Sequence, residues 1–387
     1  MSLSVSRPES LLRPLVIPRL TMMGPGPVAC APRVVASFSH QMLPTYACND
    51  SLVDIMKQVR QGLQYVFQTN NQHTFAVSGA AHAALECALL NTLEPGEVVL
   101  VTVHGLWGER ASEIAERHDA KVKQIRKDLG QVFTLEELQQ GLEEHRPAIL
   151  FMTHGESTGG TLQPLKGVGE LCHKYNCLLV IDAVATVGAI PFFMDEWGID
   201  VVITGAHKCL GGPVGVSPIS FSTRAWKKIE TRVTKIRSFY LDAKLLAQCW
   251  GAMEPMKYHH TCLPINVYGL REALAMITEE GLEAVWTRHS INSEQLWSGL
   301  EKLGLHMYVE NKDYRLATVS LICVPDGVDW RAVVDYIREK HMLQIEGSLG
   351  PLGGKVWRIG MMAYNSSPYN VELAVNAMKD ALETLKA

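Results

Sequence analysis

The sequence has no apolar stretch long enough to form a membrane-spanning helix. Its longest apolar run, from Cys177 to Met194, is interrupted by Asp182, whereas a bilayer requires roughly 20 apolar residues. A basic face is also missing, because 36 basic side chains are spread among 40 acidic ones, for a net charge of -4. We therefore expect neither a membrane nor a nucleic acid as a partner.

A disulfide framework, a metal site and a nucleotide-binding loop are not indicated either. The nine cysteines lack the spacing of a framework or of a zinc site, so we expect free thiols, an intracellular protein and no metal. Arg7, Arg13 and Arg19 resemble a transit peptide, but nearby prolines oppose an amphipathic helix. The C-terminal Leu385-Lys386-Ala387 lacks the Ser-Lys-Leu signal. We expect the peroxisome or the cytosol, with the mitochondrion as an alternative.

Short apolar runs alternate with amphipathic segments in the first two thirds of the chain. The runs do not alternate with polar residues, which is typical of strands buried on both faces. These expected strands are Thr74–Gly79, Val98–Val103, Ala148–Thr153, Cys177–Val184 and Val201–Thr204. Helices are expected at Ala83–Leu93, at Gly108–Arg117, and from the capping box Thr134-Leu-Glu-Glu137 to about His145. The pattern predicts an α/β domain with a mainly parallel sheet.

The pattern changes after about residue 265. A long helical stretch is expected over Tyr268–Leu303, followed by a strand at Ala317–Val324 and a helix at Trp330–Lys340. Another strand near Lys355–Met361 and a last helix complete a smaller α+β unit. We predict an N-terminal arm at residues 1–21, a large domain at 22–275 and a small domain at 276–387.

Asp182 and Lys208 are the first candidates for chemistry. Asp182 ends an apolar run, at the sheet edge where ligands bind in open α/β folds. Lys208 follows the next apolar strand, 26 residues later, where burial would lower its pKa and free its amine. Alone, either residue could be a capped strand end or a solvated loop lysine. Together they suit pyridoxal phosphate, whose pyridine nitrogen pairs with a carboxylate and whose aldehyde reacts with a lysine.

Three other segments could complete such a site. The small residues of Ser78-Gly79-Ala80-Ala81-His82 precede a helix whose free N–H groups suit a phosphate, although a plain tight turn is equally compatible. Trp107 follows a strand and could stack on a planar ring or simply pack in the core. Arg358, inside an apolar strand, could hold a ligand carboxylate or form an internal salt bridge.

Several longer motifs occur in the order found in a known family. The sequence resembles the class V aminotransferases, especially the animal alanine–glyoxylate (serine–pyruvate) and insect 3-hydroxykynurenine enzymes, over nearly its whole length. The motifs are Met23-Gly-Pro-Gly-Pro27, Tyr65-Val-Phe-Gln-Thr69, Thr153-His-Gly-Glu-Ser157, Leu162-Gln-Pro164, Val180-Ile-Asp182, Tyr258-His-His-Thr261 and Arg358-Ile-Gly360. The resemblance implies a type I pyridoxal-phosphate-transferase fold, as in aspartate aminotransferase, and a homodimer.

The same resemblance implies a role for each site residue. Lys208 would bind the cofactor covalently and act in catalysis with Asp182, which pairs with the pyridine nitrogen. The other expected cofactor contacts are Ala80, Ala81, His82, Trp107, Ser157, Val184 and His207, with Tyr258 and Thr261 contributed by the second subunit. The substrate would meet Gly26, Tyr46, Ser157 and Arg358.

The chain departs from the family pattern at several of these positions. Ala80 replaces a serine of the phosphate turn, His207 replaces a glutamine, Val28-Ala29 replaces Ser-Asn, and Tyr46 replaces a small residue near the substrate. We expect transfer of the amino group of alanine or serine to glyoxylate, giving glycine and, from alanine, pyruvate. The alternative is a 3-hydroxykynurenine transaminase that makes xanthurenic acid, if Tyr46 stacks on the aromatic donor.

Single features of the sequence resemble two other enzyme classes. Gly155-Glu-Ser157-Thr-Gly159 matches the nucleophile elbow of serine hydrolases. The elbow needs a helix directly after it, and Pro164 opposes a helix there. A cysteine desulfurase would need a mobile nucleophilic cysteine, whereas Cys323 lies in a strand expected to be buried.

Overall fold

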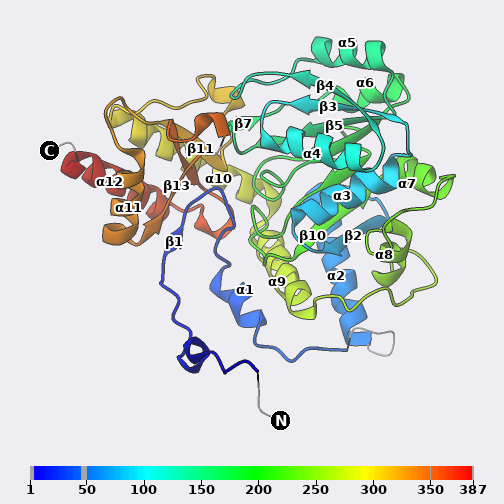
Figure 1. Cartoon of the computed structure of the whole chain (residues 1–387), viewed down its shortest axis with the longest axis horizontal. Coiled ribbons are helices and arrows are strands. Elements are labelled where there is room, and N and C mark those ends of the chain that lie inside the picture. The colour runs from blue at the N-terminus through cyan, green and yellow to red at the C-terminus, as the bar shows by residue number, and fades with distance from the viewer. Residues whose placement is uncertain (1–3, 45–49, 349, 386–387) are drawn as a thin grey trace.

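The computed structural model describes residues 4–44, 50–348 and 350–385. It contains a large α/β part and a smaller α+β part, with the N-terminal segment running along the smaller part (Figure 1). No helix in these ranges is long and apolar enough to cross a membrane.

A seven-stranded sheet forms the centre of the large part. All neighbouring strands are parallel except β10, which is antiparallel to both of its neighbours. The order is β2 (His73–Ser78), β10 (Val216–Phe221), β9 (Val201–Ile203), β8 (Leu178–Asp182), β5 (Ile149–Thr153), β3 (Val98–Val103) and β4 (Lys121–Arg126). The expected mainly parallel sheet is confirmed, and its five apolar strands are all present, within a few residues of their expected ends.

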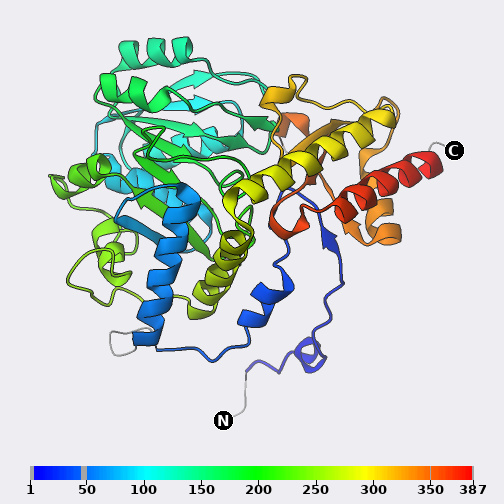
Figure 2. The same ribbon diagram turned by 180° about the vertical axis from the view of Figure 1, so that it is seen from behind.

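Helices cover both faces of this sheet, which is why its strands are apolar on both sides. The helices α3 (Ala81–Thr92) and α4 (Leu106–Arg117) lie on the face toward the viewer in Figure 1. The opposite face, toward the viewer in Figure 2, carries α2 (Asp50–Phe67), α5 (Leu135–His145) and α6 (Val168–Lys174). The capping box of α5 is confirmed, because Thr134 and Glu137 bond reciprocally.

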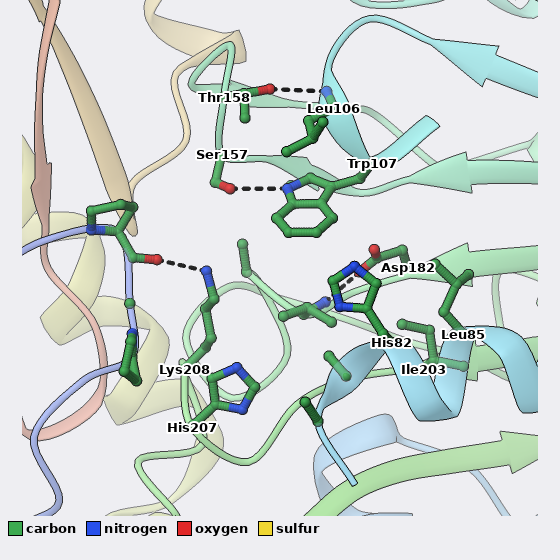
Figure 3. A pocket seen from close by; sticks show the side chains of 18 of the residues that line it. His82, Leu85, Leu106, Trp107, Ser157, Thr158, Asp182, Ile203, His207 and Lys208 are labelled. Carbon is green, nitrogen blue, oxygen red and sulfur yellow. Dashed lines mark hydrogen bonds between the residues drawn. The ribbon is translucent and has the colours of Figure 1, made fainter. Parts of the chain in front are cut away.

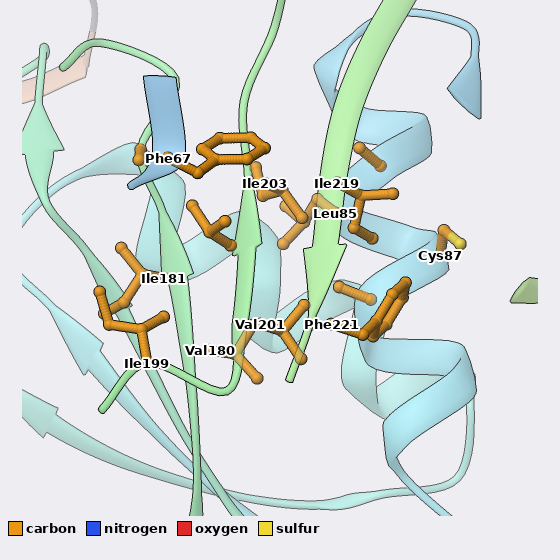
Figure 4. Close-up of a cluster of buried hydrophobic side chains, with 14 of the residues drawn as sticks. Phe67, Leu85, Cys87, Val180, Ile181, Ile199, Val201, Ile203, Ile219 and Phe221 are labelled. Atoms are coloured by element: carbon orange, nitrogen blue, oxygen red, sulfur yellow. The ribbon is translucent and has the colours of Figure 1, made fainter. Parts of the chain in front are cut away.

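The core between these layers is closely packed. Figure 4 shows Ile203 and Ile219 on adjacent strands near Leu85 of α3, with Phe67 of α2 over the sheet. All four side chains are at most 2% exposed. Complete burial of such a side chain stabilises the fold by roughly 1.5–3 kcal/mol, so this core fixes the strand ends that carry the site.

The helical stretch expected over Tyr268–Leu303 is present, but it is divided into two parts. The structure has two helices, α9 (Pro264–Glu280) and α10 (Leu282–Lys302). Gly281 separates them with a φ of +85°, a left-handed conformation that glycine adopts without a steric penalty. The chain turns at this glycine from the large part toward the smaller one (Figure 2).

The smaller part has its own sheet and its own hydrophobic core. Strands β11 (Val319–Cys323), β14 (Val356–Gly360) and β13 (Glu346–Gly347) pair antiparallel in that order. The helices α10, α11 (Trp330–His341) and α12 (Pro368–Leu385) pack around them. The division into residues 1–21, 22–275 and 276–387 stays a prediction, with residue 275 inside α9.

The N-terminal chain is tied to the smaller part by a short parallel pair. Strand β1 (Thr21–Met22) pairs with β12 (Leu343–Gln344), and Met23 belongs to the smaller hydrophobic core. The following helix α1 (Pro32–Ser37) packs on α9. This path carries residues 24–27 between the two parts of the molecule, beside the Lys208 side chain.

The large part also contains two short helices and a small hairpin. The helices α7 (Thr223–Glu230) and α8 (Ala243–Cys249) follow β10 in the chain. Strands β6 (Gly155–Glu156) and β7 (Thr161–Leu162) form the hairpin directly after β5.

Candidate active site

A cavity of about 300 Å³ lies at the carboxyl ends of the parallel strands, where ligands bind in α/β sheets of this kind. Strands β3, β5, β8 and β9 each lead into it, while the smaller part contributes Glu346 and Arg358. The expected site residues that line it are Gly26, Ala80, Ala81, His82, Trp107, Ser157, Asp182, Val184, His207, Lys208 and Arg358. Figure 3 shows most of them around the Lys208 side chain.

Lys208 is held in the cavity by the N-terminal segment. Its Nζ donates a hydrogen bond to the Pro25 carbonyl oxygen at 2.6 Å (Figure 3). The next residue, Gly26, has a φ of +110°, and a Cβ there would lie 2.9 Å from the Lys208 Cε. Burial lowers the pKa of Lys208 because the charged ammonium is poorly solvated. The amine is therefore easier to deprotonate than a surface lysine.

Asp182 is the last residue of β8 and is only 5% exposed. The Val184 backbone N–H donates to its Oδ1 at 2.9 Å. Burial raises the pKa of Asp182 to about 7; the nearby Glu156 carboxylate acts in the same direction, and Val184 and Lys208 oppose it. A buried carboxylate in such surroundings is suited to a cationic ligand group.

Trp107 is fixed by the segment that follows β5. Its Nε1 donates to the Ser157 Oγ at 3.1 Å (Figure 3). Its backbone N–H donates to the Glu156 Oε2 at 3.2 Å, and the Leu106 N–H donates to the Thr158 Oγ1 at 3.1 Å. These acceptors satisfy free N–H groups at the start of α4, so the hairpin segment sets the position of the indole.

Glu156 was not identified as a candidate from the sequence. It is fully buried, and its Oε1 accepts hydrogen bonds from the Thr158 N–H and hydroxyl. Burial raises its pKa. The sequence Thr153-His-Gly-Glu-Ser157, in which polar residues follow a buried strand, could have indicated Glu156 as a site residue. The burial of Glu156, however, depends on its contact with α4.

The start of α3 faces the cavity with small residues. Ala80, Ala81 and His82 all line it, and among the residues that the structure describes no side chain caps the helix at Ala80. The His82 ring lies edge-on to the Trp107 ring, with 5.7 Å between the ring centres. Helix N–H groups that are not capped by a side chain can bind an anion at such a position.

His207 lies beside this helix start. A Cβ placed on Gly205 would lie 2.8 Å from the His207 Cε1 and 3.2 Å from the Ala81 Cβ. Its Nδ1 is buried and has no hydrogen-bond partner within the described part of the chain. Burial and the neighbouring Lys208 lower the pKa of His207 to about 4. The neutral ring thus holds a polar atom near the helix start that a ligand could satisfy.

Arg358 enters the cavity from β14. It is 6% exposed, and its Nε donates to the Gly347 carbonyl at 3.0 Å. That bond orients the guanidinium and leaves its two terminal nitrogens for other partners. The Glu346 Oε2 lies 3.8 Å from the Arg358 Nη2. This is too long for a hydrogen bond.

Tyr258 and Thr261 do not line this cavity. The Tyr258 hydroxyl and the Thr261 Oγ1 are 3.1 Å apart, and Tyr258 is 51% exposed. The structure thus places this expected pair on the surface of the chain. Tyr46 lies outside the described residues.

The family model for class V aminotransferases matches residues 37–367. The chain belongs to the class V aminotransferases.

Relatives of this family match over nearly the full length of the chain. A marmoset (Callithrix jacchus) protein named alanine–glyoxylate aminotransferase is 47% identical, over 98% of this chain and 92% of its own. A Drosophila melanogaster protein of the same name is 42% identical, over 99% and 98%. The crystal structure of alanine–glyoxylate aminotransferase from Nostoc sp. is 41% identical with a TM-score of 0.94, covering 98% of this chain and 100% of that one. The protein is therefore a transaminase with the fold expected from the sequence.

The serine-hydrolase alternative finds no support in this aminotransferase. Ser157 is followed by a turn and by β7 of the small hairpin, not by a helix. Its Oγ accepts a hydrogen bond from Trp107. The expectation that Pro164 prevents a helix here is confirmed, because the segment lacks the strand–helix geometry of a nucleophile elbow.

Proposed function

We propose that this aminotransferase uses pyridoxal phosphate to transfer the amino group of alanine, or of serine, to glyoxylate, giving glycine together with pyruvate from alanine or hydroxypyruvate from serine. The observation that carries the proposal is the convergence of Lys208, Asp182 and Arg358 on one cavity. An amine, a buried carboxylate and a guanidinium are the three groups that an amino acid and this cofactor require together.

The residues present fit the cofactor. Asp182 offers a carboxylate for the pyridine nitrogen, and Lys208 offers an amine for the aldehyde. The start of α3 suits a phosphate, and so does the His207 Nδ1, which has no hydrogen-bond partner among the described residues. Ala80 cannot supply the hydroxyl that relatives have there, so the backbone and His207 would have to compensate.

Each side chain then has one task. When bound, pyridoxal phosphate supplies an aldehyde that captures the amino group and a ring that accepts electrons. The Lys208 Nζ, with its pKa lowered by burial, would take the proton from the substrate Cα as a general base and would return it, as a general acid, to the cofactor carbon that carried the aldehyde. Asp182 would keep the ring nitrogen protonated, and Arg358 would bind the substrate carboxylate through its terminal nitrogens.

The remaining lining residues would orient the ring. Trp107 would cover one face and Val184 the other. Ser157 already accepts the Trp107 Nε1–H, so its own hydroxyl proton is available to donate to the ring oxygen. The backbone N–H groups of Ala81 and His82 would hold the phosphate.

The cofactor can be tested directly on the purified protein. We expect a yellow protein whose visible absorption disappears on borohydride reduction. After digestion, the peptide that contains Lys208 should carry the added mass of the reduced cofactor. A colourless protein that stays inactive with added pyridoxal phosphate would contradict the proposal, and modification of a different lysine would contradict the assignment of Lys208.

The substrate assignment rests on a single guanidinium group that can bind one carboxylate. Arg358 is the one arginine or lysine besides Lys208 among the described residues that line the cavity. A second carboxylate would therefore have no partner, which disfavours aspartate and glutamate as donors. The relatives named alanine–glyoxylate aminotransferase support small donors with glyoxylate as the acceptor.

We expect a higher kcat/KM for alanine than for 3-hydroxykynurenine when glyoxylate is fixed. The cavity of about 300 Å³ must hold both cofactor and donor, and an aromatic ring needs additional room. A preference of tenfold or more for 3-hydroxykynurenine would overturn the assignment. A Tyr46→Gly variant would then test whether Tyr46 selects the donor.

We also propose a homodimer in which Tyr258 and Thr261 contact the phosphate of the second subunit. The exposed position of Tyr258, outside the cavity of its own chain, supports this arrangement, and a two-fold axis would give both sites the same contact. Mixed Lys208→Ala and Tyr258→Ala subunits should regain activity after exchange, because one site of each hybrid has both native residues. This test requires Tyr258→Ala alone to be impaired. A monomer that is fully active at assay concentration would rule out the dimer.

A further inference from the structure

Glu346 faces the cavity next to Arg358. The two residues are direct partners in the antiparallel pair of β13 and β14, so their side chains project from the same face of the sheet. Both line the cavity. The Arg358 side chain is 7% exposed and the Glu346 side chain 44% exposed, which places the arginine deeper and the glutamate nearer to solvent.

The Glu346 carboxylate does not occupy the hydrogen-bonding groups of the arginine. Its Oε2 is 3.8 Å from the Arg358 Nη2, a distance at which charge is felt but no hydrogen bond forms. The N-terminal segment leaves room for it, because a Cβ on Gly24 would lie 3.3 Å from the Glu346 carboxyl carbon. Glu346 therefore adds a negative charge to the cavity while Arg358 stays able to bind a carboxylate.

The charges of Arg358 and Glu346 determine which amino donors can bind at their end of the cavity. Arg358 and Glu346 together are neutral, so a bound substrate carboxylate leaves one net negative charge. A second carboxylate on the substrate would meet repulsion there, whereas an ammonium or another N–H donor would be attracted. Asp182, the other carboxylate in the lining, is buried and is assigned to the ring nitrogen.

We propose that Glu346 is a specificity-determining residue, which favours amino donors with a cationic or hydrogen-bond-donating side chain and rejects dicarboxylic donors. The substrate class thus extends from alanine and serine to short diamino monocarboxylic acids. This inference rests on the proposed function, in particular on Arg358 as the group that binds the substrate carboxylate.

The test uses donors of similar length and different charge. We would measure kcat/KM for 2,4-diaminobutyrate, asparagine and aspartate, with alanine as the reference and glyoxylate as the acceptor. For the native holoenzyme we expect 2,4-diaminobutyrate to exceed aspartate by at least about tenfold. Glu346→Gln keeps the size of the side chain and should reduce this ratio by about tenfold.

The ratio of the two charged donors separates selectivity from other effects. Any change in the affinity of Arg358 for the α-carboxylate affects both donors equally. Such a change therefore cancels in the ratio of their kcat/KM values. Glu346→Asp should restore part of the selectivity, because it restores the charge. Glu372→Gln, at an exposed position on α12, changes the net charge equally and should leave the ratio unaltered. Inhibition by malonate relative to acetate should strengthen in Glu346→Gln, as a measure of binding without turnover.

The outcomes distinguish this inference from the proposed function. A ratio in Glu346→Gln within twofold of the native value, or equal losses for alanine and 2,4-diaminobutyrate, would overturn the role of Glu346. A native protein that transaminates none of the donors, or an Arg358→Lys variant with unchanged KM values for donors, would instead overturn the proposed function.

Discussion

Replacing Lys208 by alanine is expected to lower kcat for transamination on the order of 10⁴-fold, since both covalent binding of the cofactor and proton transfer at Cα depend on its amine. Within the described lining of the cavity, Lys208 is the only lysine, so no other amine can replace it. Its Nζ bonds to the Pro25 carbonyl, and alanine leaves that oxygen without this partner. The measurement is single-turnover kinetics with alanine and glyoxylate, together with the absorption spectrum.

Two controls separate the chemistry of Lys208 from its contribution to the fold. Lys123→Ala, at an exposed position on the edge strand β4, removes the same charge and should retain native activity. Added methylamine should restore part of the proton transfer in Lys208→Ala, because a free base can enter the space left by the side chain. Activity of Lys208→Ala within tenfold of the native value would refute its assigned role.

Replacing Asp182 by asparagine is expected to lower kcat at least about 100-fold, the cost of losing one preorganised charge in an active site. Asparagine retains an oxygen that can accept the Val184 N–H bond but cannot hold the ring nitrogen protonated. The spectrum and kcat of the cofactor-loaded variant measure this effect. A variant that retains more than a tenth of the native kcat would contradict the role given to Asp182.

Asp182→Asn is expected to lower kcat, but in the cofactor-free protein it should raise the stability of the fold at pH 8. Burial raises the pKa of Asp182 from 3.8 to about 7, so between these values the folded protein binds a proton that the unfolded chain has lost. Stability due to Asp182 is therefore present at pH 4 and is lost as the pH rises toward 7, by on the order of 4 kcal/mol.

Thermal unfolding of the cofactor-free protein at pH 5 and pH 8 tests this. The drop in midpoint between these pH values should be smaller for Asp182→Asn than for the native chain, and the variant should be more stable at pH 8. Because the other titrating groups are shared, their effects cancel in the comparison. Identical pH dependence of the two proteins would show that Asp182 is not desolvated as the structure indicates.

The sequence predicted the elements whose pattern is local. The five apolar strands and the capping box at Thr134 were recognisable because burial on both faces and helix capping leave a direct mark on neighbouring residues. Strand β4 was missed, since it lies at the sheet edge and its apolar residues alternate with Lys121 and Lys123. Strand β10 was missed because Ser217, Pro218 and Ser220 interrupt its apolar character and proline is rare in central strands.

Pro218 is tolerated in β10 through its position in the sheet. Its carbonyl accepts the Thr204 N–H, although its nitrogen has no hydrogen to donate. The antiparallel direction of β10 also had no local signal. Strand order and direction depend on which segments meet across the sheet, and these contacts join residues far apart in the sequence, such as Val216 and Ser78.

For the site, the sequence alone determined which chemical groups are available and which strand ends carry them. Asp182, Lys208 and Arg358 were identifiable because an ionisable residue at the end of, or within, an apolar run must have a partner or a ligand. Trp107 and the start of α3 were recognisable from their positions directly after expected strands, and the family resemblance added Ser157. Only the tertiary structure decided what surrounds these groups. It buried Glu156 beneath the start of α4 and set Glu346 beside Arg358 through the register of β13 and β14. It also left the His207 Nδ1 without a hydrogen-bond partner in the part of the chain that the structure describes. Burial and charge depend on distance in space, and the chain brings these residues together only when its sheets and helices pack.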